Sequence, residues 1–153
     1  MTATKAGNVG DFLAAVIDAS VGIKLFISED GSEQAYRIFS QLTVDPPASF
    51  FVPDLFYIEC TNILWKYVQR FGYTAEKARQ DINDLLSLAL HGIPTANLAS
   101  DALELALAYD LTAYDASYAA LAKRLELPFI TADNPLAQKL ASSEIAVLSL
   151  WEF

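Results

Sequence analysis

Short apolar runs typical of buried strands alternate along this chain with longer segments of helical periodicity, and this alternation strongly constrains the fold. The expected strands lie at 14–17, 49–52, 128–132 and 145–150. The expected helices lie at 21–27, 32–42, 54–71, 74–89, 100–109, 112–126 and 134–141. The segment HGIP (91–94) is expected to end the fourth of these helices. Strands separated by helices indicate a three-layer α/β/α sandwich with a central, mainly parallel sheet.

The length and composition are those of one folded domain. The chain has 153 residues, of which 54% are hydrophobic and 19% charged, so an intrinsically disordered chain is excluded. Residues 1–11 are small and polar and are expected to form a flexible N-terminal segment, which leaves 12–153 as a single domain. No apolar run is long enough to span a membrane, and the first one lacks a signal-peptide cleavage site. A cytoplasmic protein is therefore expected.

The net charge, the single cysteine and the single histidine limit the kinds of partner and site that are expected. Ten Lys and Arg against nineteen Asp and Glu give a net charge of -9, which disfavours unspecific adhesion to nucleic acid or anionic membranes. This charge does not exclude a nucleic-acid substrate, because carboxylates that hold divalent cations also make a sequence acidic. Cys60 is the only cysteine and is expected to be buried. His91 is the only histidine and is expected to lie near a helix end.

Two expected strands are followed by a carboxylate. Asp18 directly follows the first strand, and Asp133 follows the strand at 128–132. Ligands of parallel sheets bind outside the carboxyl ends of the strands, so both acids are candidates for one site. Helix capping is the alternative for each acid. For Asp133 this alternative is disfavoured, because Asn134 is the better N-cap residue and Pro135 then takes the first helical position.

Two further acids lie on expected helices. Glu59 lies at the edge of a buried stripe, where a carboxylate needs either a metal or a salt bridge, for example to Lys66. Asn62 falls on the same helix face and is a candidate to orient this carboxylate. Asp115 follows Thr112 at the spacing of a capping box, so capping alone accounts for it unless it converges with the other acids.

Four segments, read in this order, span almost the whole chain: VIDASV (16–21), ECTNIL (59–64), TAYDASYAALA (112–122) and FITADNPL (129–136). Together they resemble the PIN-domain ribonucleases, and most closely the toxins of the VapC type from bacterial toxin–antitoxin pairs. The resemblance implies a five-stranded parallel sheet with helices on both faces. It also implies an acidic metal site at Asp18, Glu59, Asp115 and Asp133. Asn134 is the candidate for a further Asp or Asn that many members carry.

Carboxylates at this density suit hard cations, so Mg²⁺ or Mn²⁺ is the expected cofactor. Such ions make a bound water nucleophilic and offset charge on phosphate oxygens. Ser20 and Thr131 each stand two positions from an acid and are expected to hydrogen-bond the carboxylates or the substrate, with a turn position as the alternative.

Basic and aromatic side chains near these motifs are candidate RNA contacts. Lys66 and Arg70 continue the helix stripe of Glu59, where they would meet a phosphate backbone, although a solvated helix face is the alternative. Tyr114 and Tyr118 lie beside the third acid and are candidates to stack on bases of single-stranded RNA, with core packing as the alternative.

The sequence thus predicts a metal-dependent endoribonuclease that acts on RNA. The resemblance further implies a toxin that forms a homodimer and is held in check by a small antitoxin protein. The alternatives are a housekeeping PIN nuclease in RNA processing and a catalytically silent PIN binding module. A phosphotransferase of the haloacid dehalogenase type is disfavoured, because Ser20 stands where that class has a second Asp.

Overall fold

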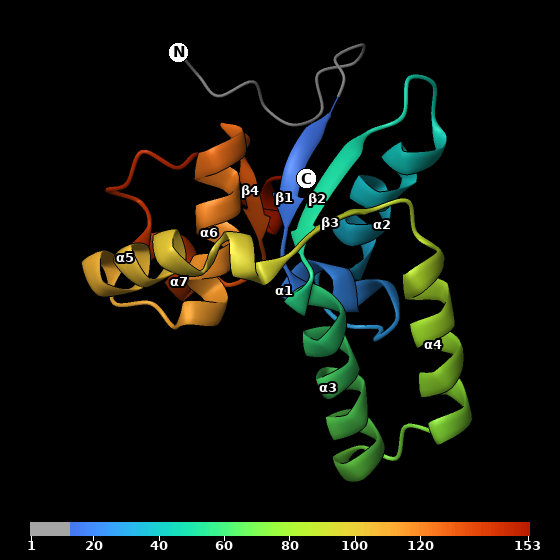
Figure 1. The fold of residues 1–153 in the computed structure, drawn as a ribbon. Helices are drawn as coiled ribbons and strands as arrows, with labels where there is room; N and C mark the ends of the chain where they lie inside the picture. The colour runs from blue at the N-terminus through green and yellow to red at the C-terminus, as the bar shows by residue number, and fades with distance from the viewer. Residues whose placement is uncertain (1–12) are drawn as a thin grey trace.

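The computed structural model describes residues 13–153, so the segment expected at 1–11 lies outside the described residues. Five strands form one sheet in the order β3-β2-β1-β4-β5, and every neighbouring pair is parallel. Helices cover both faces of this sheet (Figure 1). The predicted three-layer α/β/α sandwich with a five-stranded parallel sheet is therefore confirmed. The strands are β1 (Ala14–Ile17), β2 (Ser49–Pro53), β3 (His91–Ile93), β4 (Phe129–Thr131) and β5 (Val147–Ser149).

The helices follow the predicted order. Thr74 and Thr112 cap the helices that begin after them, since their hydroxyls accept hydrogen bonds from backbone amides three positions on. The α-helices in residues 13–153 are α1 (Ala19–Gly22), α2 (Ser32–Ser40), α3 (Leu55–Arg70), α4 (Ala75–Ser87), α5 (Ala99–Tyr109), α6 (Ala113–Leu125) and α7 (Asn134–Lys139). None of them combines the length and the apolar character that crossing a bilayer needs.

One predicted element is wrong, and another is shorter than predicted. The segment expected to end a helix at 91–94 is the edge strand β3, whose residues pair with β2 from His91↔Phe51 onward. A strand of three residues, one of them a glycine, is too short to show the alternation of buried and exposed side chains. It forms because it pairs with β2 and because the His91 ring stacks on Phe51. The strand expected at 145–150 is limited to β5, because Ser149 caps a 3₁₀ turn over Leu150–Glu152.

Side chains of the central strands alternate between two cores, one on each face of the sheet. In β1, Val16 belongs to the core that also contains side chains of α3, α5 and α6, whereas Ala15 and Ile17 belong to the core that contains side chains of α2. All three are 0% exposed, and each Val or Ile side chain buried this way contributes about 1.5–3 kcal/mol of transfer free energy. Cys60 is also fully buried, as predicted.

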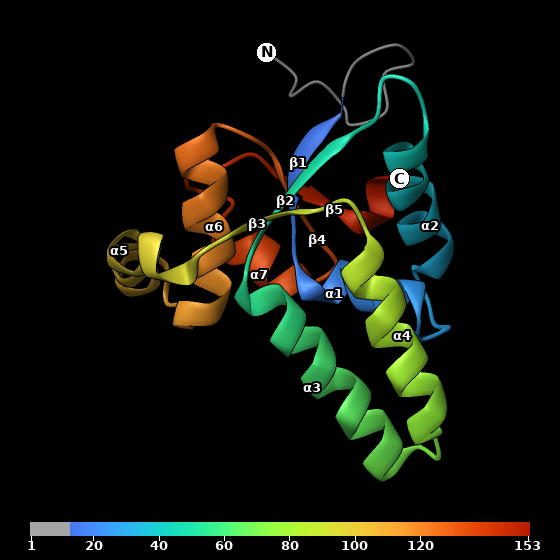
Figure 2. The same cartoon turned by 45° about the vertical axis from the view of Figure 1, so that its right-hand side comes forward.

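One close helix contact fixes the start of α3 against α1, the helix that follows β1. A Cβ atom added to Gly22, the last residue of α1, would lie 2.6 Å from the Phe56 ring of α3. A larger residue at position 22 would therefore push α3 away from α1. Figure 2 shows the beginning of α3 together with α1, α6 and α7 around the carboxyl ends of β1 and β4. Four separate helices thus meet at the sheet edge that carries Asp18 and Asp133.

Candidate acidic site

Asp18 is a buried carboxylate at the carboxyl end of β1. It is 5% exposed, and its Oδ1 accepts hydrogen bonds from the Ser20 hydroxyl at 2.5 Å and the Val21 amide at 3.3 Å. Its Oδ2 accepts a hydrogen bond from the Thr131 hydroxyl at 2.5 Å. Both hydroxyls therefore bond to the carboxylate, as the sequence predicts. Burial raises the pKa of Asp18 to about 7, although these three hydrogen bonds oppose the rise.

The same two hydroxyls join the ends of β1 and β4. The Ser20 hydroxyl oxygen accepts a hydrogen bond from the Ala132 amide at 2.9 Å, and that of Thr131 accepts one from the Asp133 amide at 3.1 Å. The two hydroxyl oxygens are 3.4 Å apart. The strand ends that carry Asp18 and Asp133 are therefore tied together by a small hydrogen-bonded network.

Asp133 caps α7, which corrects the prediction that Asn134 does so. The Asp133 Oδ1 accepts a hydrogen bond from the Leu136 amide at 3.0 Å. Because the Ala137 amide already donates to the Asp133 carbonyl, the helix begins after Asp133 and no free amide remains for Asn134 to cap. Asn134 is exposed in the first turn of α7.

Glu59 is half-buried on α3, and its partner is a tyrosine. The Tyr118 hydroxyl of α6 donates a hydrogen bond to the Glu59 Oε1 at 2.7 Å. Burial raises the pKa of Glu59, and the Tyr118 hydrogen bond opposes this rise. Within residues 13–153 Glu59 forms no ion pair, so the alternative of a salt bridge to Lys66 is not realised. Asn62 is exposed and makes no hydrogen bond to Glu59 in the described part of the chain.

Asp115 is electrostatically coupled to the other three acids. Burial raises its pKa first, and the negative charge of Asp133 raises the pKa further. In addition to burial, the charge of Asp115 raises the pKa values of Asp18 and Glu59. Like charges raise each other's pKa in this way within a partly buried site. The four acids, at the end of β1, on α3, on α6 and at the β4–α7 junction, thus interact electrostatically through Asp115.

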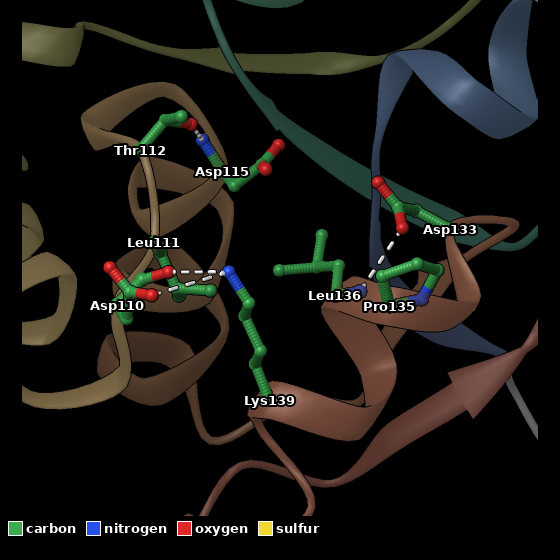
Figure 3. Close-up of a pocket in the computed structure, with 8 residues that line it drawn as sticks. All are labelled: Asp110, Leu111, Thr112, Asp115, Asp133, Pro135, Leu136 and Lys139. Carbon is green, nitrogen blue, oxygen red and sulfur yellow. Dashed lines mark hydrogen bonds and ion pairs between the residues drawn. The ribbon is translucent and has the colours of Figure 1, made fainter.

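A cleft of about 380 Å³ opens beside two of these acids. In Figure 3, Asp115 and Asp133 lie on opposite sides of the cleft with their carboxylates turned toward it. On a third side the Lys139 Nζ donates to the Asp110 carbonyl at 2.7 Å and lies 3.8 Å from the Asp110 Oδ2. The lining residues are Asp110, Leu111, Thr112, Asp115, Asp133, Pro135, Leu136 and Lys139.

Sequence reasoning did not include Lys139 among the site residues. It is the only basic residue among the described residues that line the cleft. The available signal was its position three residues after Leu136, which places both side chains on one face of α7.

The expected RNA contacts divide into exposed and buried residues. Tyr114 is 67% exposed on α6, and Lys66 and Arg70 are exposed on α3, so all three stay predictions. Tyr118 is 1% exposed, and its ring stacks on Phe129. This burial contradicts the prediction that Tyr118 stacks on a base. Only its hydroxyl reaches the site, where it bonds to Glu59.

The donor set suits a hard divalent cation, because it consists of carboxylates. Within residues 13–153, no three His, Cys, Asp or Glu side chains are close enough together to hold a metal ion. The four carboxylates therefore do not converge closely enough to surround a single ion position.

Residues 15–140 match the family model of the PIN domain. The chain is 35% identical over 126 residues to Ribonuclease VapC3 of Pyrobaculum aerophilum, over 81% of this chain and 92% of that protein. A toxin–antitoxin complex from Klebsiella pneumoniae has a TM-score of 0.64 at 19% identity, covering 91% of this chain and 99% of that chain. VapBC2 from Rickettsia felis, bound to a promoter DNA fragment, has a TM-score of 0.66 at 11% identity, covering 90% and 98%. At these identities the two structures show the fold alone.

Proposed function

The chain belongs to the PIN-domain family, and from this premise we propose that it is a metal-dependent endoribonuclease and the toxin of a toxin–antitoxin pair. The observation that carries the proposal is the cleft lined by Asp115 and Asp133, whose Asp133 is joined through Thr131 to the buried carboxylate of Asp18. The name of the relative from Pyrobaculum aerophilum, a ribonuclease, supports RNA as the substrate. All four acids are present, which disfavours the catalytically silent alternative.

The four carboxylates would hold Mg²⁺ or Mn²⁺. Like charges in a partly buried site repel each other, and a bound cation relieves that repulsion. Mg²⁺ usually keeps several waters and takes only one or two protein carboxylates plus substrate phosphates. A set of acids that does not close on one point is therefore compatible with such an ion.

When bound, the cation would supply an activated water and offset charge on the scissile phosphate. The protein's own residues orient the acids. Ser20 and Thr131 fix both oxygens of Asp18, and the capping hydrogen bond to the Leu136 amide fixes Asp133. The cleft beside Asp133 gives a phosphodiester access, and Lys139 supplies a positive charge for it there.

Cleavage assays with purified protein test the proposal. Single-stranded RNA should be cut in the presence of Mg²⁺ or Mn²⁺, and EDTA should stop the reaction. A double variant with Asp18→Asn and Asp133→Asn should be inactive. Equal cleavage in EDTA, or a fully active double variant, would contradict the proposed function.

An antitoxin and a second copy of the chain are the proposed protein partners, and the cytoplasm is the proposed compartment. One structural neighbour is described as a toxin–antitoxin complex, which supports the antitoxin. Large apolar side chains are exposed on α3, where Ile58 is 67% and Trp65 55% exposed, and such side chains suit an interface. Helices in the first half of the chain are therefore the candidate surfaces.

Sedimentation at micromolar concentration should show a dimer, and the product of a neighbouring small gene should co-purify with the protein. A strict monomer that does not bind this gene product contradicts both partnerships. A gene neighbourhood of RNA-processing enzymes would instead favour the housekeeping nuclease.

A further inference from the structure

Tyr118 connects the buried core to the acidic site. Its side chain is 1% exposed, and its ring lies parallel to that of Phe129 in β4, with the centroids 6.0 Å apart and 4° between the planes. A buried phenol hydroxyl needs a hydrogen-bond partner. Here the partner is the carboxylate of Glu59, a residue 59 positions earlier in the chain and on a different helix.

The four acids differ in how they are held. Asp18 accepts three hydrogen bonds, and Asp133 is fixed by the helix cap. Glu59 has the longest side chain of the four, with one more torsion to immobilise than Asp. Among residues 13–153, the only hydrogen bond to its carboxylate comes from Tyr118. Without that bond, no other hydrogen bond or ion pair in the described residues would hold the Glu59 carboxylate.

We propose that Tyr118 is a positioning residue that holds the Glu59 carboxylate toward Asp115, so that Glu59 is oriented to ligate the divalent cation. The proposal rests on the proposed metal-dependent function. The bond engages the Oε1 of Glu59 and leaves the Oε2 for a cation, since each carboxylate oxygen offers its own lone pairs.

The elements that fix Tyr118 are those that carry the other acids. Tyr118 follows Asp115 by three positions on α6, and its ring packs on β4, the strand that leads through Thr131 to Asp133. Its hydroxyl therefore sets the position of a carboxylate on α3 relative to carboxylates on α6 and after β4. Partners of this kind, which hold a metal ligand in place, typically change metal affinity or activity by 10–100-fold when removed.

Tyr118→Phe is the direct test, because it removes the hydroxyl and keeps the ring that stacks on Phe129. We expect Mn²⁺ affinity, measured by calorimetry and by the electron paramagnetic resonance signal of free Mn²⁺, to fall by roughly 10-fold or more. The kcat for RNA should fall, whereas KM should change little. Tyr36→Phe on α2 is the control, since this side chain is 55% exposed and belongs to no part of the acidic site, and it should leave Mn²⁺ affinity unchanged.

A double-variant cycle shows whether Tyr118 acts through Glu59. In a Glu59→Gln background, Tyr118→Phe should cause no further loss of Mn²⁺ affinity, because the ligand that the hydroxyl orients is already gone. An equal further loss in that background overturns the proposal. So does a Tyr118→Phe variant that melts earlier in EDTA yet binds Mn²⁺ as the wild type does, since that result marks a purely structural hydroxyl.

The two proposals fail in different ways. If the wild-type protein binds no Mn²⁺ and cuts no RNA, the proposed function is overturned and the positioning proposal with it. If the wild type binds Mn²⁺ and cuts RNA, and Tyr118→Phe does both equally well, only the positioning proposal is overturned.

Discussion

The acidic site has two halves that differ in character. The inner half is Asp18 with its donors Ser20 and Thr131, and the outer half is Asp115 and Asp133 on the two sides of the cleft. In the inner half the carboxylate is buried and both of its oxygens are hydrogen-bonded. In the outer half the carboxylates face a cleft open to a ligand and repel each other.

The two halves should therefore contribute differently to stability and to activity. The inner half is a fixed carboxylate whose hydrogen bonds also join β1 to β4. The outer half is where added positive charge, from a cation, would relieve repulsion. Changes in the inner half should therefore affect both stability and activity, whereas neutralising a carboxylate of the outer half without removing its hydrogen bonds should affect activity and leave stability nearly unchanged.

The largest expected effect is on cleavage by an inner-half variant. Asp18→Asn keeps the side-chain shape but removes the charge, so RNA cleavage should fall by on the order of 10²–10³-fold, as for the loss of one electrostatic catalytic group. Single-turnover cleavage of a short RNA measures the loss. Asp84→Asn, an exposed acid on α4, is the control and should retain activity. Activity of Asp18→Asn within a few-fold of the wild type would remove Asp18 from the reaction.

The raised pKa of Asp18 predicts how stability depends on pH in EDTA. The folded-state pKa of about 7 is above the ordinary value of 3.8, so between these values the folded protein keeps a proton that the unfolded chain loses. This stabilising contribution is complete below about pH 4 and is lost as the pH rises through 7. The loss should be on the order of a few kcal/mol.

Denaturant titrations from pH 5 to 8 check this dependence. Asp18→Asn should flatten the decline, because it removes the group whose pKa shift is largest of the three raised acids. Saturating Mn²⁺ should offset the decline, since the cation binds the ionised carboxylate. A wild-type stability that rises with pH in EDTA would contradict the inner-half description.

Thr131→Val tests the hydrogen bonds of the inner half without changing a charge. The variant keeps the side-chain shape at a position that is 1% exposed and removes the donor to the Asp18 Oδ2. Buried groups left without partners cost about 1–3 kcal/mol in the free energy of unfolding. Urea denaturation measures the loss, and Thr61→Val on the exposed face of α3 should stay within about 0.5 kcal/mol. Equal stabilities would show that the Thr131 hydroxyl is dispensable.

The order of strands and helices could be predicted because burial imposes a period of two or 3.6 residues on the sequence. Strand β3 could not, since its three residues are defined by pairing with β2. The helix cap at Asp133 depends on which amide remains free, which the residue types alone do not determine.

The candidate site was predictable in part for the same reason. Asp18 and its two hydroxyl donors lie within a few residues of strand ends, so local spacing identified them. The contact of Tyr118 with Glu59 joins helices far apart in sequence, and the same holds for the coupling of Asp115 to the other acids. Such contacts follow from the packing of α3 and α6 on the sheet, which no local pattern encodes.

The smallest expected change in stability belongs to an outer-half variant, Asp133→Asn. The amide oxygen of Asn can still accept the hydrogen bond from the Leu136 amide, and Asn is as good an N-cap as Asp, so α7 keeps its cap. The substitution also removes the negative charge that raises the pKa of Asp115. In EDTA the variant should therefore melt at or slightly above the wild-type temperature while being inactive.

Melts in EDTA and in a Mn²⁺ titration at fixed ionic strength check this prediction. A ligand that binds only the folded state raises the melting temperature, so Mn²⁺ should stabilise the wild type and the variant much less. Asp133→Ala is the matched comparison, because it loses the same charge and also the cap, at a cost of about 1 kcal/mol. A variant Asp133→Asn that melts clearly earlier in EDTA and keeps the full Mn²⁺ shift would mean that Asp133 is only a helix cap, and that the outer half of the site does not bind the cation.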